Sequence, residues 1–519
     1  MARASSLRSE SLHAEIRSNY RAKYQALKAK FDAAATNTDN MRHWANADGL
    51  SAEAAASPEV RRTLRNRSRY ECQESNAYGK GIVLKHAAHI VGRVPRLQLQ
   101  TPDKAFNKFV ERHFRRWAQA VKLGAKLRTL AASKTVDGEA FAKLIDNPKV
   151  NHGVKLDLRL IEADQIATPL LSPLTDNYVD GIKFDALGNV VHYDLLPVHP
   201  GSTAIVGRPF ALEPIPVAPE LMLHWFREDR PNQKRGLPET TPSLPLFAQL
   251  RRFTMATIAA AETAAEYAGI LKTQGVPEDG AAEVDPLEAI ELEMRSLLSL
   301  PAGWDISQIK AEHPTTTFEM FERAILTQIA QSIVMPNNIA SGDSSKHNFA
   351  SGRLDHKLYQ AAIGIERYDL ECGVLLQLFA AWYREFKLWA ATAGLWAGAL
   401  PAFDALDFVW FFDQADYSVD LNREASGTEK LFAIGAYGHP EYYANNGGDW
   451  SDEMDKNAEA WGCTPAEYRT LICLRTFGAV PKRNEDLLAI VTQAPQDQAN
   501  DGTGDGSTAD GGSDAREAA

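Results

Sequence analysis

The sequence predicts an α+β protein that is predominantly helical and divided into several domains. A chain of 519 residues is too long for one ordinary core, because single cores stop growing beyond roughly 250–300 residues. In several long stretches apolar residues recur at steps of three and four, as they do in amphipathic helices. Between residues 138 and 226 the repeat shortens to two, which is typical of short strands.

Composition places the chain among globular proteins without a membrane segment, metal centre or cofactor. Apolar residues make up 45% and charged residues 24%, and no stretch approaches the roughly 20 apolar residues that span a bilayer. The four cysteines are far apart and form no zinc-ligand pattern, which favours a reducing cytosol. Residues 1–30 are basic and lack the apolar core of an export signal, so we expect synthesis in the cytoplasm.

The net charge of −11 argues against a protein that binds nucleic acid by neutralising many phosphates. It does not argue against a protein through which DNA slides. If copies of the chain close into a ring, an acidic inner wall would repel phosphates and prevent DNA from sticking.

The N-terminal third predicts helices and one strand. Residues 11–32 form an amphipathic helix with a basic outer side, and a loose arm follows to Pro58. The capping-box pattern of Ser68 and Glu71 predicts a helix start, and Gly92 a helix end. Val94–Gln100 alternates like a half-buried strand, and a helix with a strong apolar stripe then runs from Thr101 to Gly124.

Short strands follow, and Asp185–Asn189 is a plausible hairpin connection between two of them. The predicted strands are Phe141–Ile145, Leu156–Ile161, Ile182–Phe184, Val190–Leu195 and Leu221–Phe226. Helices return in the C-terminal half, over residues 242–272, 317–335 and 350–392, and a further helical region extends to about residue 491.

Three polar segments separate or follow these helices. Residues 273–316 are acidic and rich in proline and glycine, with a short helix (Pro286–Leu300) and a strand (Trp304–Ile309). Asn337–Asn348 is expected to be a polar loop. Residues 493–519 form an acidic tail of a composition typical of disorder.

No set of residues predicts catalysis. The phosphate-binding pattern G-x-x-x-x-G-K is absent. His86 and His89 could hold a metal, but no third ligand accompanies them, which favours packed or surface side chains. The paired carboxylates Asp137 with Glu139, and Glu162 with Asp164, could act as acid and base or serve as turn residues at strand ends.

One charged segment is more specific. His224–Pro238 joins a buried strand to a long helix, and by composition alone it is a solvated turn. Its residues fit H-x-F-R-x-x-R-P-x-Q-x-R-G-x-P, which resembles a segment of the portal proteins of lambda-like tailed phages. Two further blocks resemble the same family, one around Asn76–Gly79 and His89–Gly92, and one from Met335 to Arg353. In the last block Ala350 and Gly352 replace small or hydroxyl residues of the family pattern.

The resemblance extends over about residues 61–462 and implies a portal-type architecture. A mixed α/β wing (61–241) precedes two stem helices (242–272 and 317–335) that flank a small α/β clip (273–316). A tunnel loop (336–349) then leads to a wing helix and helical crown (350–492). The basic helix and arm (1–60) and the disordered acidic tail (493–519) lie outside this layout.

The resemblance also implies a function without catalysis or cofactors. About a dozen copies would form a ring at the portal vertex of the virion. Through it the terminase large subunit would drive double-stranded DNA without sequence preference, and DNA would leave during ejection. The major capsid protein, the scaffold and head-tail adaptor proteins would be further partners.

Two sets of residues are candidates for these contacts. Lys346, His347, Asn348 and Arg353 would face DNA from the tunnel loop, although such residues could simply cap the helix that begins near Ala350. The acidic clip residues Glu278, Asp279, Glu283 and Asp285 would dock the terminase. Two rival hypotheses are a cytosolic hydrolase with a dispersed active site and a connector of another ring family, although such adaptors do not need 519 residues.

Overall fold

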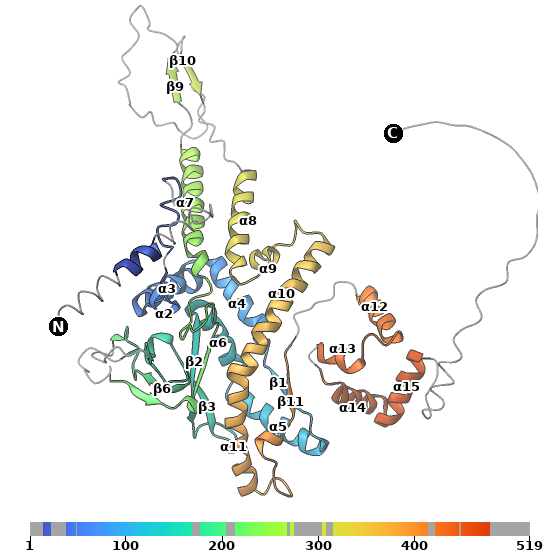
Figure 1. The fold of residues 1–519 in the computed structure, drawn as a ribbon. Coiled ribbons are helices and arrows are strands. Elements are labelled where there is room, and N and C mark those ends of the chain that lie inside the picture. Colours follow the sequence, from blue (N-terminus) through green and yellow to red (C-terminus); the bar gives the residue numbers. More distant parts are fainter. Residues whose placement is uncertain are drawn as a thin grey trace, which may run out of the picture.

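The computed structural model has an α+β architecture in which helices predominate (Figure 1). It describes residues 14–21, 38–47, 49–168, 177–203, 213–266, 270–273, 304–307, 315–413, 421–445 and 448–477. A body of helices and small sheets carries projecting helices at one end, and a group of short C-terminal helices lies beside it (Figure 1). Among the residues described, no helix is long and apolar enough to cross a membrane.

The N-terminal helices begin and end elsewhere than predicted. Residues 14–21, inside the predicted helix 11–32, are helical, and the short α2 (Ala52–Ala55) precedes α3 (Pro58–Arg69). A π-helical turn (Tyr70–Ser75) joins α3 to α4 (Ala77–Val91). The predicted start at Ser68 is wrong, because this buried side chain bonds to the Thr240 hydroxyl (2.8 Å) in the middle of a continuous helix. Asn76 caps α4 instead, and Gly92 ends it with a φ of 66° as predicted.

Two helices occupy the region where the sequence predicts one. The predicted strand is confirmed as β1 (Arg96–Leu99), and α5 (Lys104–Ala120) follows with Asp103 as its cap. The predicted end at Gly124 is wrong, because α6 (Leu123–Asp137) begins just before it. A Cβ atom on Gly124 would lie 2.0 Å from the Arg93 carbonyl oxygen, so this glycine permits close packing instead of ending a helix.

All five predicted strands are confirmed, and they fall into two antiparallel sheets. In one sheet β2 (Glu139–Asp146) lies between β3 (Leu156–Ile161) and β8 (Met222–Phe226). The other has the order β4 (Tyr178–Val179), β5 (Ile182–Phe184), β6 (Val190–Leu195), β7 (Ile215–Val217). The hairpin at Asp185–Asn189 is also confirmed, by a backbone bond from Asp185 to Asn189 of 2.9 Å. Single 3-10 turns lie at Ala163–Gln165, Pro219–Leu221 and Thr241–Ser243.

The projecting helix pair consists of α7 (Leu244–Glu266) and α8 (Thr315–Gln331). The prediction that the first helix continues to residue 272 is wrong, because β9 (Ile270–Thr273) pairs antiparallel with β10 (Trp304–Ser307). β10 itself confirms the predicted strand. This small hairpin lies at the far end of the helix pair (Figure 1). The predicted helix Pro286–Leu300 lies outside the described residues.

The predicted loop Asn337–Asn348 is partly wrong, because α9 (Asn337–Ser341) occupies its first part. The second predicted helix ends at Gln331, and Val334 adopts a φ of 56° before α9. The long helix is confirmed as α10 (Phe349–Leu370) and α11 (Leu376–Thr392), which are continuous through a π-helical turn (Glu371–Leu375).

The main core lies where α11 packs on α5. Fully buried aromatic rings meet there, with Trp117 and Phe114 on α5 facing Trp382 and Phe379 on α11. A 3-10 turn (Phe403–Ala405) leads to β11 (Phe408–Phe411), an unpredicted strand that pairs with β1. The predicted C-terminal helical region contains α12 (Leu421–Ala433), α13 (His439–Asn445), α14 (Trp450–Trp461) and α15 (Pro465–Phe477). The predicted disordered tail lies outside the described residues.

Candidate functional sites

The charged segment His224–Pro238 has an exposed turn at residues 228–232, as its composition suggests, but Gln233 and Arg235 beyond that turn are buried. Gln233 organises it: its Oε1 accepts from the Asp229 and Arg230 backbone amides, and its Nε2 donates to the Arg235 carbonyl (2.9 Å). The Arg235 side chain is fully buried and forms an ion pair with Glu139 at 2.7 Å. Gly236 allows this approach, since a Cβ atom there would lie 2.0 Å from the Gly138 oxygen.

Three arginines at four-residue spacing on α3 join the same buried network. Arg61 pairs with Asp180 at 3.1 Å. Arg65 pairs with Glu139, and with Asp164 at 3.2 Å. The next turn brings Arg69 to Asp137 at 2.7 Å and to Asp164 at 2.6 Å. Because charges in a protein interior are tolerated only when paired and hydrogen-bonded, this network fixes α3, β2 and the charged segment in one arrangement.

The carboxylates considered for acid and base chemistry belong to this network. Burial alone would raise the pKa of Glu139, but Arg235 and Arg65 outweigh burial and hold that pKa well below its usual value. Burial would also raise the pKa of Asp164, but Arg69 and Arg65 outweigh burial and lower this pKa. At Asp137 burial prevails over Arg69, and the pKa is raised. The arginine contacts assign these three side chains a structural role.

One group of side chains has metal-ligand geometry among the described residues. Glu162, Asp164 and His199 offer ligand atoms within 4.8 Å of one another. Arg65 and Arg69 already bind the two carboxylate oxygens of Asp164, and their positive charge opposes a cation at this position. We therefore interpret this group as an extension of the ion-pair network.

A second buried charge cluster connects the charged segment to the long helix. Lys134 on α6 pairs with Glu239 at 2.7 Å and with Glu366 of α10 at 2.6 Å. His86 and His89 direct Nδ1 at the Tyr359 hydroxyl, at 3.4 and 3.1 Å, as packed side chains do. Burial lowers the pKa of His86 to about 4, so its ring is neutral at neutral pH.

The structure separates the four residues predicted to face DNA into two kinds. Asn348 caps α10, accepting from the Ser351 amide at 2.8 Å, and His347 is half-buried with Nε2 3.3 Å from the Arg323 guanidinium. Lys346 and Arg353 are exposed, and Lys346 lies 3.2 Å from Glu319 on α8. The sequence shows both a capping pattern at Asn348 and cations beside it. It gives no sign that the loop contacts α8, because that contact joins separate elements.

The predicted clip residues Glu278, Asp279, Glu283 and Asp285 lie outside the described residues. Their proposed contact with a terminase therefore stays a prediction.

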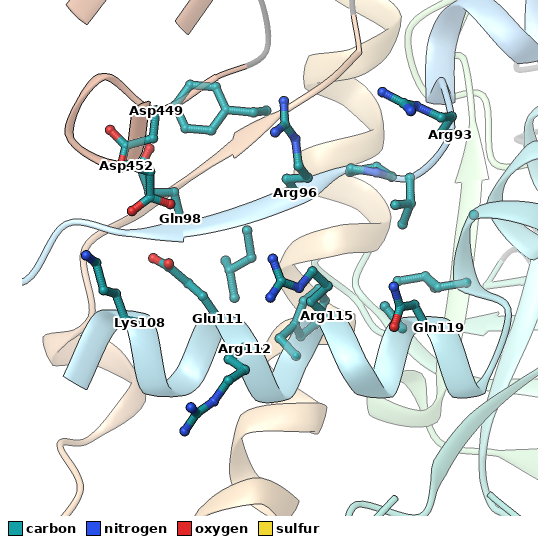
Figure 2. Close-up of a pocket in the computed structure, with 18 of the residues that line it drawn as sticks. Arg93, Arg96, Gln98, Lys108, Glu111, Arg112, Arg115, Gln119, Asp449 and Asp452 are labelled. Atoms are coloured by element: carbon teal, nitrogen blue, oxygen red, sulfur yellow. The ribbon is translucent and has the colours of Figure 1, made fainter. Parts of the chain in front are cut away.

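A cavity of about 720 Å³ that sequence reasoning missed lies between the body and the C-terminal helices. Figure 2 shows Lys108, Glu111 and Arg115 of α5 directed toward β1, while Arg112 points away, and Asp449 and Asp452 approach from the C-terminal side. An ion pair of 2.6 Å joins Lys108 to Asp455 of α14. Burial, then Asp452 and Asp449, raise the pKa of Glu111 to about 7, although it accepts from the Leu99 amide. The cavity wall is thus basic on one side and acidic on the other.

A comparison with known families identifies the chain. A sequence model of the family described as phage portal protein, lambda family, matches residues 37–363, which is more than half of the chain. The chain belongs to this family. The buried network of Arg65, Glu139 and Arg235 and the α9–α10 junction lie within the matched residues.

Individual relatives of this portal-family chain are distant. It is 25% identical over 284 residues to a protein named probable portal protein of Halomonas phage phiHAP-1, and the match covers 50% of the chain. The chain spans about half (53%) of the length of that relative. Two similar solved structures are titled virion of native gene transfer agent particle and neck of empty gene transfer agent particle computed with C6 symmetry. They are 14% and 15% identical with TM-scores of 0.41 and 0.42, and each alignment covers 74% of this chain and 93% of the other.

Proposed function

We propose that the chain is the portal subunit of a tailed phage or a related particle. About a dozen copies would form a closed ring at one vertex of the virion, with double-stranded DNA passing through the centre. The single observation that carries this proposal is the family match over residues 37–363. In this function the chain has no bond-making centre, and the terminase large subunit supplies the work of packaging.

The domain layout is proposed on the same basis, with boundaries adjusted to the observed elements. The wing comprises residues 61–241, and α7 and α8 are the stem helices. The clip begins at β9 and ends beyond β10, at the far end of the stem (Figure 1). Residues 343–348, between α9 and α10, are the tunnel loop, and the helices after β11 are the crown. α10 and α11 form the wing helix, residues 1–60 are the N-terminal arm, and residues 493–519 are the acidic tail.

An apolar seam on α10 supports assembly with further copies. Large apolar side chains that are 45–66% exposed lie on α10 and at the start of α11, separated by four, seven, three and eight residues: Leu354, Leu358, Ile365, Tyr368 and Leu376. The small exposed residues Ala361 and Gly364 lie among them, which permits another helix to approach closely. A continuous apolar stripe of this kind is costly in water and marks a protein interaction surface.

A ring needs a second, different surface on each copy, because its contacts run head to tail. The helix at residues 14–21 lies on the side of the molecule away from α10 (Figure 1). Its Ile16 and Tyr20 are 44% and 73% exposed, and Val60 on the neighbouring α3 is 43% exposed. These apolar groups are candidates for the partner surface of the seam.

The mass of the purified particle tests the proposed function. We expect a ring of about a dozen chains by native mass spectrometry, and a rotationally symmetric annulus in negative-stain microscopy. A lone chain of 57.2 kDa under native conditions would contradict the proposal.

We further propose that the acidic clip residues dock the terminase. Deleting residues 278–285 should preserve the ring and abolish terminase binding, because Glu278, Asp279, Glu283 and Asp285 supply the negative charge of this segment. Pull-down of the terminase large subunit by purified rings measures the effect. Normal recruitment by the deleted ring would remove this assignment while leaving the ring itself unaffected.

A further inference from the structure

A basic pocket lies behind the proposed tunnel loop and is separate from the loop's exposed cations. It has a volume of about 360 Å³ and lies between α4, α9 and α10. Four basic side chains line it, two from α4 and two from α10: Lys85, His89, His356 and Arg367. Among the described residues that line this pocket, none carries a carboxylate.

The neutral lining groups are those that recognise an oxyanion. Asn338, Ser344, Tyr359 and Gln360 place amide and hydroxyl groups around the pocket. Such groups complement the acceptor oxygens of a phosphate, which accept several hydrogen bonds at once. The apolar residues Ile339 and Ile363 complete the wall.

Two of the cations are held in position by main-chain oxygens. Lys85 donates to the Ile339 and Ala340 carbonyls at 2.7 and 3.3 Å, and an ammonium has a third N–H for a ligand. Arg367 donates to the carbonyls of Ile90, His89 and Asp413 at 2.7–3.1 Å. Neutral carbonyls orient these charges without cancelling them, so both remain able to attract an anion.

The electrostatic effect of this arrangement is visible at His89. Burial lowers its pKa, and His356, Arg367 and Lys85 lower it further through like-charge repulsion. A bound anion would relieve that repulsion and favour the protonated imidazole. The lining is therefore positively charged on balance, although the Asp413 carboxylate acts on Arg367 from outside it, and an anion would neutralise this charge.

We propose that this pocket binds a phosphate-type oxyanion through Lys85, His89, His356 and Arg367. The anion is either free phosphate or a phosphate of a DNA backbone. Ser344 places the pocket's rim on the loop 343–348, so a bound anion would tie this loop to α4 and α10. The assignment does not depend on ring formation, because every lining residue belongs to one chain.

Titration calorimetry of the full chain with inorganic phosphate tests the proposal. We expect saturable binding of one phosphate per chain, weakened roughly tenfold or more by Lys85→Gln and by His356→Gln, since the first variant removes a charge-assisted hydrogen bond and the second removes an imidazole nitrogen that lines the pocket. Lys357→Gln is the matched control, because Lys357 is exposed on the same helix and does not line the pocket.

Three results would overturn the pocket assignment: phosphate that does not bind saturably, variants that bind normally, or a control that weakens binding equally. Thermal unfolding of each variant checks the fold. If the Lys85→Gln variant does not fold because it loses the contacts of Lys85 with α9, the variant of the half-buried His356 still provides the test.

A short DNA duplex added to the phosphate complex distinguishes the two sources of the anion, free phosphate and a DNA backbone. Displacement of the phosphate indicates a backbone phosphate as ligand, and retention indicates free phosphate.

Discussion

At the scale of single residues, the family-like charged segment matters because of what it buries. Its exposed arginines are those expected of a solvated turn, whereas Arg235 reaches Glu139 in the interior. A buried ion pair adds little when complete, but it is expensive to break, because the remaining charge has lost both water and partner. The network therefore specifies one arrangement of α3, β2 and the segment more than it adds net stability.

Arg235→Ala should destabilise the protein by about 3 kcal/mol or more, since it leaves Glu139 buried with fewer compensating charges. Because Arg235 and Arg65 hold the pKa of Glu139 below its usual value, their contribution is present at neutral pH and is lost as the pH falls through the lowered pKa. Urea unfolding measures both effects. Arg62→Ala is the control: Arg62 is 45% exposed, lies 3.5 Å from Asp180, and should cost less than about 1 kcal/mol. Equal losses in the two variants would contradict the structural role of Arg235.

The exposed cations of the α9–α10 junction lead to a second prediction. If Lys346 and Arg353 face DNA in the ring, the double variant Lys346→Glu and Arg353→Glu should reduce packaged or retained DNA severalfold, because it replaces attraction to phosphates with repulsion. DNA protected from nuclease in a packaging assay gives the measurement. Lys149→Glu, a charge reversal at an exposed position in the turn after β2, should package normally. Unchanged packaging by the double variant would reject the role of both residues.

At the scale of elements, the sequence predicted what depends on local periodicity. The strands Leu156–Ile161 and Val190–Leu195 were predicted with their observed bounds, because alternation of side chains is a local property of a half-buried strand. α6 was missed because it is buried on most sides, which leaves no apolar stripe of helical period. β11 was missed because its partner β1 lies some three hundred residues earlier, and this pairing has no local pattern.

The candidate sites were predictable to a smaller extent. Lys346 and Arg353 could be selected from the sequence, because exposed cations beside a helix start form a local pattern. The cavity beside α14 and the basic pocket behind α9 could not, since each is lined by segments distant in the chain. The burial of Arg235 was not predictable either, because it depends on the partner Glu139, which lies on β2 in a distant part of the chain.

The contact between α5 and α14 should depend on pH. The pKa of Glu111 is raised to about 7 in the folded protein, whereas the usual value, expected in the unfolded chain, is about 4.5. Between these values the folded protein holds a proton that the unfolded chain has released. The free energy of unfolding therefore falls as the pH rises from the lower value to the higher one. Glu111→Gln should remove this dependence and stabilise the protein by about 1 kcal/mol at neutral pH, allowing for solvent screening. The glutamine keeps an oxygen for the Leu99 amide.

Thermal unfolding of the Glu111→Gln variant at about pH 5 and about pH 7.5 would measure the effect. Glu459→Gln, an exposed residue of the same cavity, should leave the pH dependence of the wild-type protein unchanged. Identical slopes for wild type and Glu111→Gln would show that this carboxyl group does not control the contact.

At the scale of the whole molecule, a single copy of the chain leaves the apolar seam exposed to water. The seam runs along α10 to the start of α11, over about six helical turns, and its side chains would be buried only against another chain. The net charge of −11 is repeated in every copy, so apolar contact has to overcome repulsion between subunits. The seam is therefore the feature on which we expect assembly to depend most.

Leu358→Glu or Ile365→Glu should convert rings to single chains without lowering the melting temperature of the subunit. Each side chain is more than 60% exposed in the single chain, so a charge costs little there, whereas in a ring it would be buried without a partner at every contact. Native mass spectrometry gives the ratio of ring to monomer. Leu187→Glu is the matched control, because this leucine is 89% exposed on a hairpin away from the seam and its variant should assemble normally. Intact rings of both seam variants would place the subunit contact elsewhere. Loss of assembly in the control as well would attribute the effect to added negative charge, because the three substitutions change charge equally and differ only in position.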